Sequence, residues 1–77
     1  MHHKIRDMKT INELTSREKE TAKLLIKGYN NREIAEKLIV STHTAKYHVT
    51  SIINKLEALN RTHAAYIIGH KNLDKEF

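Results

Sequence analysis

Apolar residues along positions 41–59 recur at alternating intervals of four and three. They are Ala45, Val49, Ile52, Leu56 and Leu59. At about 100° per residue these positions fall on one stripe of a helix, the pattern of a helix that packs one face against a core. The spacing therefore predicts an amphipathic helix at about 42–58, with this stripe as its inner face.

The opposite face of this predicted helix is polar and carries no carboxylate before Glu57. Opposite the stripe lie His43, Tyr47, Thr50 and Asn54, with Lys46 on one flank and Thr44, Ser51 and Lys55 on the other. A cation, a tyrosine and short hydrogen-bonding side chains suit a DNA groove and its phosphates. We interpret this helix as one that recognises DNA; the alternative is an ordinary solvated helix face.

An earlier helix is predicted at 16–27 by its start and stop signals. Thr15 can cap the N-terminus while Glu18, three residues on, completes a capping box. Ala22, Leu25 and Ile26 supply its buried stripe. Gly28 then follows as a residue that can adopt the left-handed conformation of a helix C-cap.

A short second helix is predicted between this helix and the long one. Asn30 and Glu33 have the spacing of another capping box, and the inward stripe is short. That stripe consists of Ile34, Ala35 and Leu38. Ser41 can cap the long helix, so only a tight turn fits between Leu38 and Thr42. Two helices joined by so short a turn form a helix-turn-helix pattern.

The last predicted helix starts at Thr62 as its cap and ends near Gly69 or Lys71. Its apolar residues are Ala64, Ala65, Ile67 and Ile68. We expect residues 1–13 to form an arm and residues 72–77 a polar tail. Because proline is absent, glycine occurs twice and no alternating apolar pattern is present, the fold class is expected to be all-α.

The composition of the chain limits the kinds of partner and site that can be expected. The chain has 77 residues, enough for one small domain, with a net charge of +5 and a pI near 9.6 that favour a polyanionic partner. It contains no cysteine and no apolar run of about 18 residues, so we expect a cytoplasmic protein without disulfides or membrane spans. His2 and His3 lack further ligands nearby, and we expect neither a metal nor a cofactor.

Several motifs together resemble the LuxR-type helix-turn-helix over about residues 14–68. They are LTSRE at 14–18, GYNNREIA at 28–35, LIVS at 38–41, TAKYH at 44–48, Ile52, KL at 55–56 and NRT at 60–62. The resemblance implies a four-helix domain, placed here at 14–71, that binds double-stranded operator DNA in a bacterial transcription regulator. Such a domain is either the C-terminal output module of a response regulator or quorum sensor, or a stand-alone regulator.

The resemblance also implies roles for individual residues. The third helix would enter the major groove, Lys46 would approach base edges or phosphate, and Tyr47 and Thr50 would tune sequence choice. Thr44 and Lys55 would lie near the DNA backbone. The complete set of expected DNA-binding residues is Asn31, Arg32, Ser41, His43, Thr44, Lys46, Tyr47, Thr50, Ser51, Asn54 and Lys55.

The fourth helix would pair with a second copy to form a homodimer on DNA. We expect part of its apolar surface to remain exposed for this contact. The expected interface residues are Ala64, Ala65, Ile67 and Ile68. RNA polymerase is a further partner that the resemblance allows.

One position departs from the family pattern. Ala45 stands where valine is usual, and at about 0.8 kcal/mol per methylene its smaller side chain would cost about 1 to 2 kcal/mol of stability. The departure affects stability and leaves the expected function unchanged.

Other residues have structural explanations. Glu18 and Glu33 are explained by capping, so we expect no catalytic pair and no enzyme. We expect His48 to be a packed histidine that hydrogen-bonds backbone or phosphate, and Tyr29 and Tyr66 to be core or interface residues. Two alternative functions stay open: the promoter-reading region of an alternative sigma factor, and a truncated regulator that acts by protein–protein interaction.

Overall fold

A computed structural model describes residues 13–70 of the chain. This part contains four helices and no strand: α2 (Ser16–Ile26), α3 (Asn31–Leu38), α4 (Thr42–Lys55) and α5 (Arg61–His70). The predicted all-α fold is confirmed. The expected arm apart from Glu13, the paired histidines His2 and His3, and the expected tail lie outside the described residues. Within residues 13–70, no helix has the length and apolar character needed to cross a bilayer.

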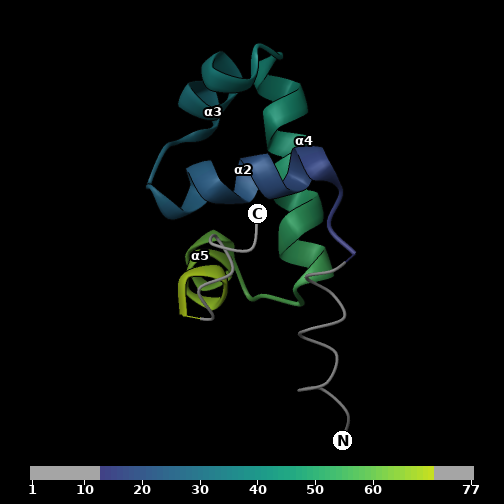
Figure 1. Cartoon of the computed structure of the whole chain (residues 1–77), viewed down its shortest axis with the longest axis vertical. Coiled ribbons are helices and arrows are strands. Elements are labelled where there is room, and N and C mark those ends of the chain that lie inside the picture. The colour runs from purple at the N-terminus through teal and green to yellow at the C-terminus, as the bar shows by residue number, and fades with distance from the viewer. Residues whose placement is uncertain (1–12, 71–77) are drawn as a thin grey trace, which may run out of the picture.

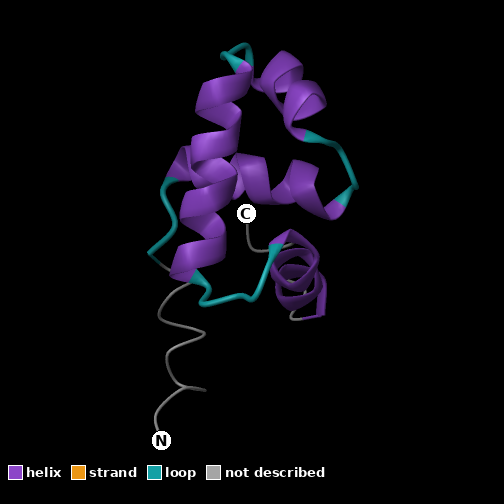
Figure 2. Cartoon of the chain, turned by 180° about the vertical axis from the view of Figure 1, so that it is seen from behind, coloured by secondary structure: helices purple, strands orange, loops and turns teal. Residues whose placement is uncertain are grey.

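The helices are arranged around α4, the longest of them. α2 crosses α4, α3 packs near the N-terminal end of α4, and α5 packs against α2 near the other end (Figure 1). Seen from behind, α4 lies in front of α2, and its length is open to the viewer (Figure 2). The crossing of α2 over α4 thus leaves one side of α4 uncovered.

The core is formed by the inward stripes of all four helices. Its buried apolar residues are Leu14, Ala22, Leu25, Ile34, Ala35, Ala45, Val49, Ile52, Leu56, Ala64 and Ile68. Ala45 is fully buried where α4 meets its neighbours, as its place on the stripe predicts. Such a core, with each helix contributing two or more residues, fixes the position of α4 relative to α2 and α3.

The predicted caps of the first two helices are confirmed in detail. The Glu18 N–H donates to Thr15 Oγ1 at 3.1 Å and the Thr15 N–H donates back to Glu18 Oε1 at 2.9 Å. Asn30 and Glu33 form the same reciprocal pair, at 2.8 and 2.9 Å. Gly28 adopts a φ of 88° after α2, the left-handed conformation that glycine tolerates.

The long helix ends earlier than predicted. α4 stops at Lys55 because Glu57 turns into the left-handed region with φ of 56°, and the Ala58 N–H then donates to the Ile53 carbonyl at 3.0 Å. Leu59, expected on the buried stripe, is therefore outside the helix and 85% exposed. The prediction was wrong here because the apolar spacing continues past the point where the backbone leaves the helix.

The last helix also differs from the prediction. Asn60 caps it by accepting from the His63 N–H at 2.9 Å, so Thr62 is already inside the helix, and the helix continues through Gly69. Ala64 and Ile68 are fully buried in the core of the single chain. Ala64 and Ile68 therefore do not contribute to the part of the apolar surface of this helix that was expected to remain exposed. Tyr66, expected to be inward, is 62% exposed.

Candidate nucleic-acid interface

The uncovered side of α4 presents the residues that the sequence placed opposite its apolar stripe. His43, Lys46, Tyr47, Thr50 and Asn54 are all exposed, and Tyr47 is 67% exposed. Ala45, Val49 and Ile52 hold the other side of the same helix in the core. The helix therefore displays one cation, one phenol and several short polar groups on a rigid support, without a carboxylate among them.

The N-terminal turn of α4 is fixed by its own side chains. Ser41 Oγ accepts from the Thr44 N–H at 3.0 Å and lies 2.9 Å from Thr44 Oγ1. Ser41 is exposed and Thr44 half-buried. No acidic residue occupies this first turn, so the positive end of the helix dipole is not neutralised by a neighbouring carboxylate. This end of α4 suits a phosphate.

Ser51 and Lys55, expected near DNA, turn toward α2 instead. Ser51 Oγ donates to Glu18 Oε2 at 2.6 Å and Lys55 Nζ donates to Glu18 Oε1 at 2.9 Å. Lys55 Nζ also donates to the Glu13 carbonyl at 3.3 Å. Both side chains thus bind the protein itself, and their contacts fix the C-terminal half of α4 against the start of α2. Position on a helical wheel does not reveal such a partner from another helix.

Glu18 is the centre of this contact, with a side chain that is only 6% exposed. Burial alone would raise the pKa of Glu18. Hydrogen bonds from Ser51, Lys55 and the Thr15 backbone, together with the positive charge of Lys55, outweigh it and hold the pKa below its ordinary value. Glu18 is therefore ionised at neutral pH, in addition to the capping role that the sequence predicts.

The start of α3 supplies Asn31 and Arg32. Arg61 of α5 donates to Asn31 Oδ1 at 2.6 Å and to the Tyr29 carbonyl at 2.7 Å. Because the oxygen of Asn31 is used, its amide nitrogen is the group left to donate to a phosphate. Arg61 is a structural residue that sequence reasoning missed: the NRT motif contains it, but no local pattern indicates its partner.

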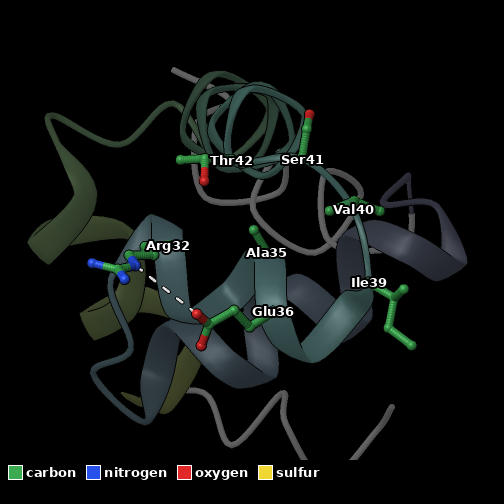
Figure 3. Close-up of a pocket in the computed structure, with 7 residues that line it drawn as sticks. All are labelled: Arg32, Ala35, Glu36, Ile39, Val40, Ser41 and Thr42. Atoms are coloured by element: carbon green, nitrogen blue, oxygen red, sulfur yellow. Dashed lines mark ion pairs between the residues drawn. The ribbon is translucent and has the colours of Figure 1, made fainter.

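Arg32 lies exposed in the first turn of α3 and lines one groove with Ser41 and Thr42 at the start of α4. Its guanidinium is paired with Glu36 at 3.9 Å, and its side chain is 82% exposed (Figure 3). The groove drawn there is lined by Arg32, Ala35, Glu36, Ile39, Val40, Ser41 and Thr42. An exposed pair of this kind contributes little to stability, so Arg32 can exchange Glu36 for a phosphate.

His48 is half-buried at the edge of the stripe, next to the exposed ring of Tyr47. The two ring centroids are 5.8 Å apart in an edge-to-face arrangement. The predicted packing is found, but Nδ1 of His48 is buried without a hydrogen-bond partner among the described residues. The expected bond to the backbone is therefore not formed at this nitrogen.

The sequence was compared with those of known proteins. Residues 12–68 match the family described as bacterial regulatory proteins, luxR family. The chain is 42% identical over 59 residues to the transcriptional regulatory protein LiaR of Bacillus subtilis, covering 77% of this chain and 28% of LiaR. It is 43% identical over 60 residues to the response regulator protein VraR of Staphylococcus aureus, covering 78% of this chain and 29% of VraR. The chain thus spans less than a third of either relative. No solved structure gives a significant match.

Proposed function

This chain belongs to the LuxR family of bacterial regulatory proteins, which act in DNA-binding transcription regulation, and from this we propose that α4 reads a specific sequence in the major groove of double-stranded DNA. The observation that carries the proposal is the exposed, carboxylate-free face of α4, which is held rigidly by the stripe behind it. A major groove admits an α-helix, and its base edges are read by side chains of this kind.

Three residues in the middle of this face are the base-reading group. The long cation Lys46 can donate to the O6 and N7 atoms of guanine, while Tyr47 and Thr50 offer hydroxyl groups that both donate and accept. His43 and Asn54 flank them toward the two ends of the helix. These five exposed side chains would discriminate between sequences.

A second group contacts the phosphates. They are Asn31 and Arg32 at the start of α3 and Ser41 and Thr44 at the start of α4, which supply donors at two helix N-termini. Ser51 and Lys55, which the sequence placed among the DNA-binding residues, belong to neither group in this proposal. They act as positioning residues, because their polar atoms bind Glu18.

We further propose that two copies pair through α5 on DNA. Ala65 and Ile67 are half-buried, and Tyr66 and Leu59 leave exposed apolar surface beside them. A twofold pair would place the two α4 helices about 34 Å apart, one turn of DNA, and would select an inverted repeat. Its contact area would be well below the roughly 1,600 Å² of stable complexes, so pairing would be firm only on DNA.

Selection of bound sequences from randomised duplexes tests the reading group. Lys46→Ala should lose discrimination at one base position by roughly 1–3 kcal/mol, and Tyr47→Ala should shift the preferred sequence. Lys27→Ala, on the far side of α2, is the control and should leave the selected sequence unchanged. If Lys46→Ala selected the same sequence with the same affinity, the assignment of this face to DNA would be wrong.

A further inference from the structure

A second surface feature lies on α2 and α3, apart from the face that reads DNA. It is a groove of about 300 Å³, which we call the α2 groove, lined by Glu20, Lys23, Leu24, Lys27, Lys37 and Leu38. The lining residues come from one side of α2 and from the last turn of α3. No residue of α4 takes part in it.

The rim of the α2 groove is positively charged. Lys23, Lys27 and Lys37 are exposed, and none of them forms an ion pair with a carboxylate among residues 13–70. The one carboxylate of the lining, Glu20, is already paired with Arg17 at 3.2 Å. Three exposed cations therefore surround the groove, and its single carboxylate does not neutralise them.

The floor of the α2 groove is apolar. Leu24 and Leu38 are half-buried and pack against the core from this side. Lys37, in the last turn of α3, also has its ammonium 5.1 Å from the centroid of the Tyr29 ring. A ligand that fits must therefore supply both negative charge for the rim and an apolar side chain for the floor.

The α2 groove faces away from the DNA-reading side of the molecule. Glu18, Thr21 and Leu25 turn toward the core, and Lys23 and Lys27 lie on the other side of the same helix. In Figure 1 α2 is in front of α4, whereas in Figure 2 α4 is in front of α2. DNA bound along α4 would therefore leave the α2 groove open.

We propose that the α2 groove docks an acidic segment of a partner protein while α4 holds DNA. Carboxylates of the segment pair with Lys23, Lys27 and Lys37, and one leucine-like side chain covers Leu24 and Leu38. Complementary charge of this kind selects and steers a partner. The apolar floor favours an acidic protein segment over a polyanion that has no apolar side chains. DNA offers the phosphates but no apolar side chain for the floor.

A titration of the ¹⁵N-labelled chain, followed by NMR, tests the proposal. The probe is a short synthetic peptide of aspartate and glutamate around a central pair of leucines, added with and without a bound DNA duplex. The amide signals of Lys23, Leu24 and Lys37 should shift in both cases. A matched peptide with serines in place of the leucines should bind about tenfold more weakly.

Two double variants with the same change of charge separate the two faces. Lys23→Ala with Lys27→Ala should weaken peptide binding about tenfold and keep DNA binding. Arg32→Ala with Lys46→Ala should lose DNA binding and keep the peptide. Since all four side chains are exposed, both variants should remain folded by circular dichroism.

The α2 groove would be overturned as a protein-docking site by an absence of peptide-induced shifts, by shifts centred on α4, or by displacement of the peptide by DNA. Displacement would assign the three lysines to DNA phosphates instead. Equal binding of the leucine and serine peptides would also overturn it, because the floor would then contribute nothing. The DNA-reading role of α4 is measured separately, so its failure would be recognised independently of the groove.

Discussion

At the scale of single residues, Glu18 and Glu33 allow a direct comparison. Both are the third residue of a helix and both complete a capping box. Glu33 is exposed, whereas Glu18 is buried and also accepts from Ser51 and Lys55. Because glutamine can complete a capping box as well, Glu→Gln at each position removes the charge and keeps the cap.

Glu18→Gln should lower the free energy of unfolding by about 2 kcal/mol at neutral pH, since hydrogen bonds to a charged group are weakened and Lys55 loses its counter-charge. Glu33→Gln, the matched control, should change it by less than about 0.5 kcal/mol. Urea unfolding of the three proteins measures both values. Equal effects would show that the contact between Glu18 and α4 contributes no stability.

The same contact predicts a dependence on pH. Because the pKa of Glu18 is held below its ordinary value, the unfolded chain binds the proton more readily, and the stabilisation is fully present only well above the ordinary pKa of glutamate. It should disappear as the pH falls through the lower pKa of the folded state. The difference in stability between the parent protein and Glu18→Gln should therefore shrink below about pH 4. A difference that stayed constant to pH 2 would contradict this assignment.

The backbone conformation of Ile39 lowers the stability of the fold. It follows α3 with φ of 57°, a left-handed conformation that is unfavourable for a β-branched side chain, and it is 89% exposed. Ile39→Asn should raise the free energy of unfolding by about 1 kcal/mol, because asparagine tolerates this conformation and little apolar contact is lost. Ile39→Val retains the branch and should give no gain. Thermal unfolding of the two variants distinguishes these outcomes.

At the scale of elements, the starts of the first three helices were predictable, whereas the start of α5 and the end of α4 were not. Capping at Thr15, Asn30 and Ser41 depends on residues within three positions, so the sequence alone indicates it. The end of α4 depends on Glu57 adopting a left-handed conformation that nothing in its residue type requires. The outer face of α4 was predictable for a similar reason, because helical period fixes which residues lie opposite the core.

Contacts between distant elements were the part that the sequence did not predict. Ser51 and Lys55 are 33 and 37 positions from Glu18, and Arg61 is 30 positions from Asn31. Periodicity assigns a residue to a face of its helix, but it does not reveal what packs there. Which apolar residues of α5 would be buried was left open for the same reason, since the burial of Ala64 and Ile68 depends on α2 lying against α5.

Burial distinguishes the residues of α5 that stabilise the core from those that are available to contact a second copy. Ile68→Ala should cost about 2–5 kcal/mol of stability, because it opens a cavity at a fully buried position. Tyr66→Ala, at an exposed position, should change stability by less than about 0.5 kcal/mol but reduce cooperative binding to an inverted repeat. Chemical unfolding and ultracentrifugation with a duplex measure these effects. One protein per full site at saturation would refute pairing through α5.

At the scale of the whole molecule, two sides of the described domain carry exposed basic side chains. One side holds Arg32 and Lys46 near the start of α4, and the other holds the three lysines of the α2 groove. Net charge attracts DNA to any part of the surface, whereas only neutralised phosphates release counterions. The dependence of DNA affinity on salt concentration therefore distinguishes direct contacts with phosphates from attraction by the net charge of the protein.

The logarithm of DNA affinity should fall linearly with the logarithm of salt concentration, by about 0.9 for each phosphate that the protein neutralises. Arg32 belongs to the group proposed to contact phosphates, so Arg32→Ala should reduce this slope by about 0.9. Lys27→Ala removes the same charge from the α2 groove and should leave the slope unchanged. Fluorescence anisotropy of a labelled duplex over a series of salt concentrations gives both slopes. An equal reduction of the slope for the two variants would mean that DNA also contacts the α2 side. A slope near zero for the parent protein would exclude the proposed phosphate contacts altogether.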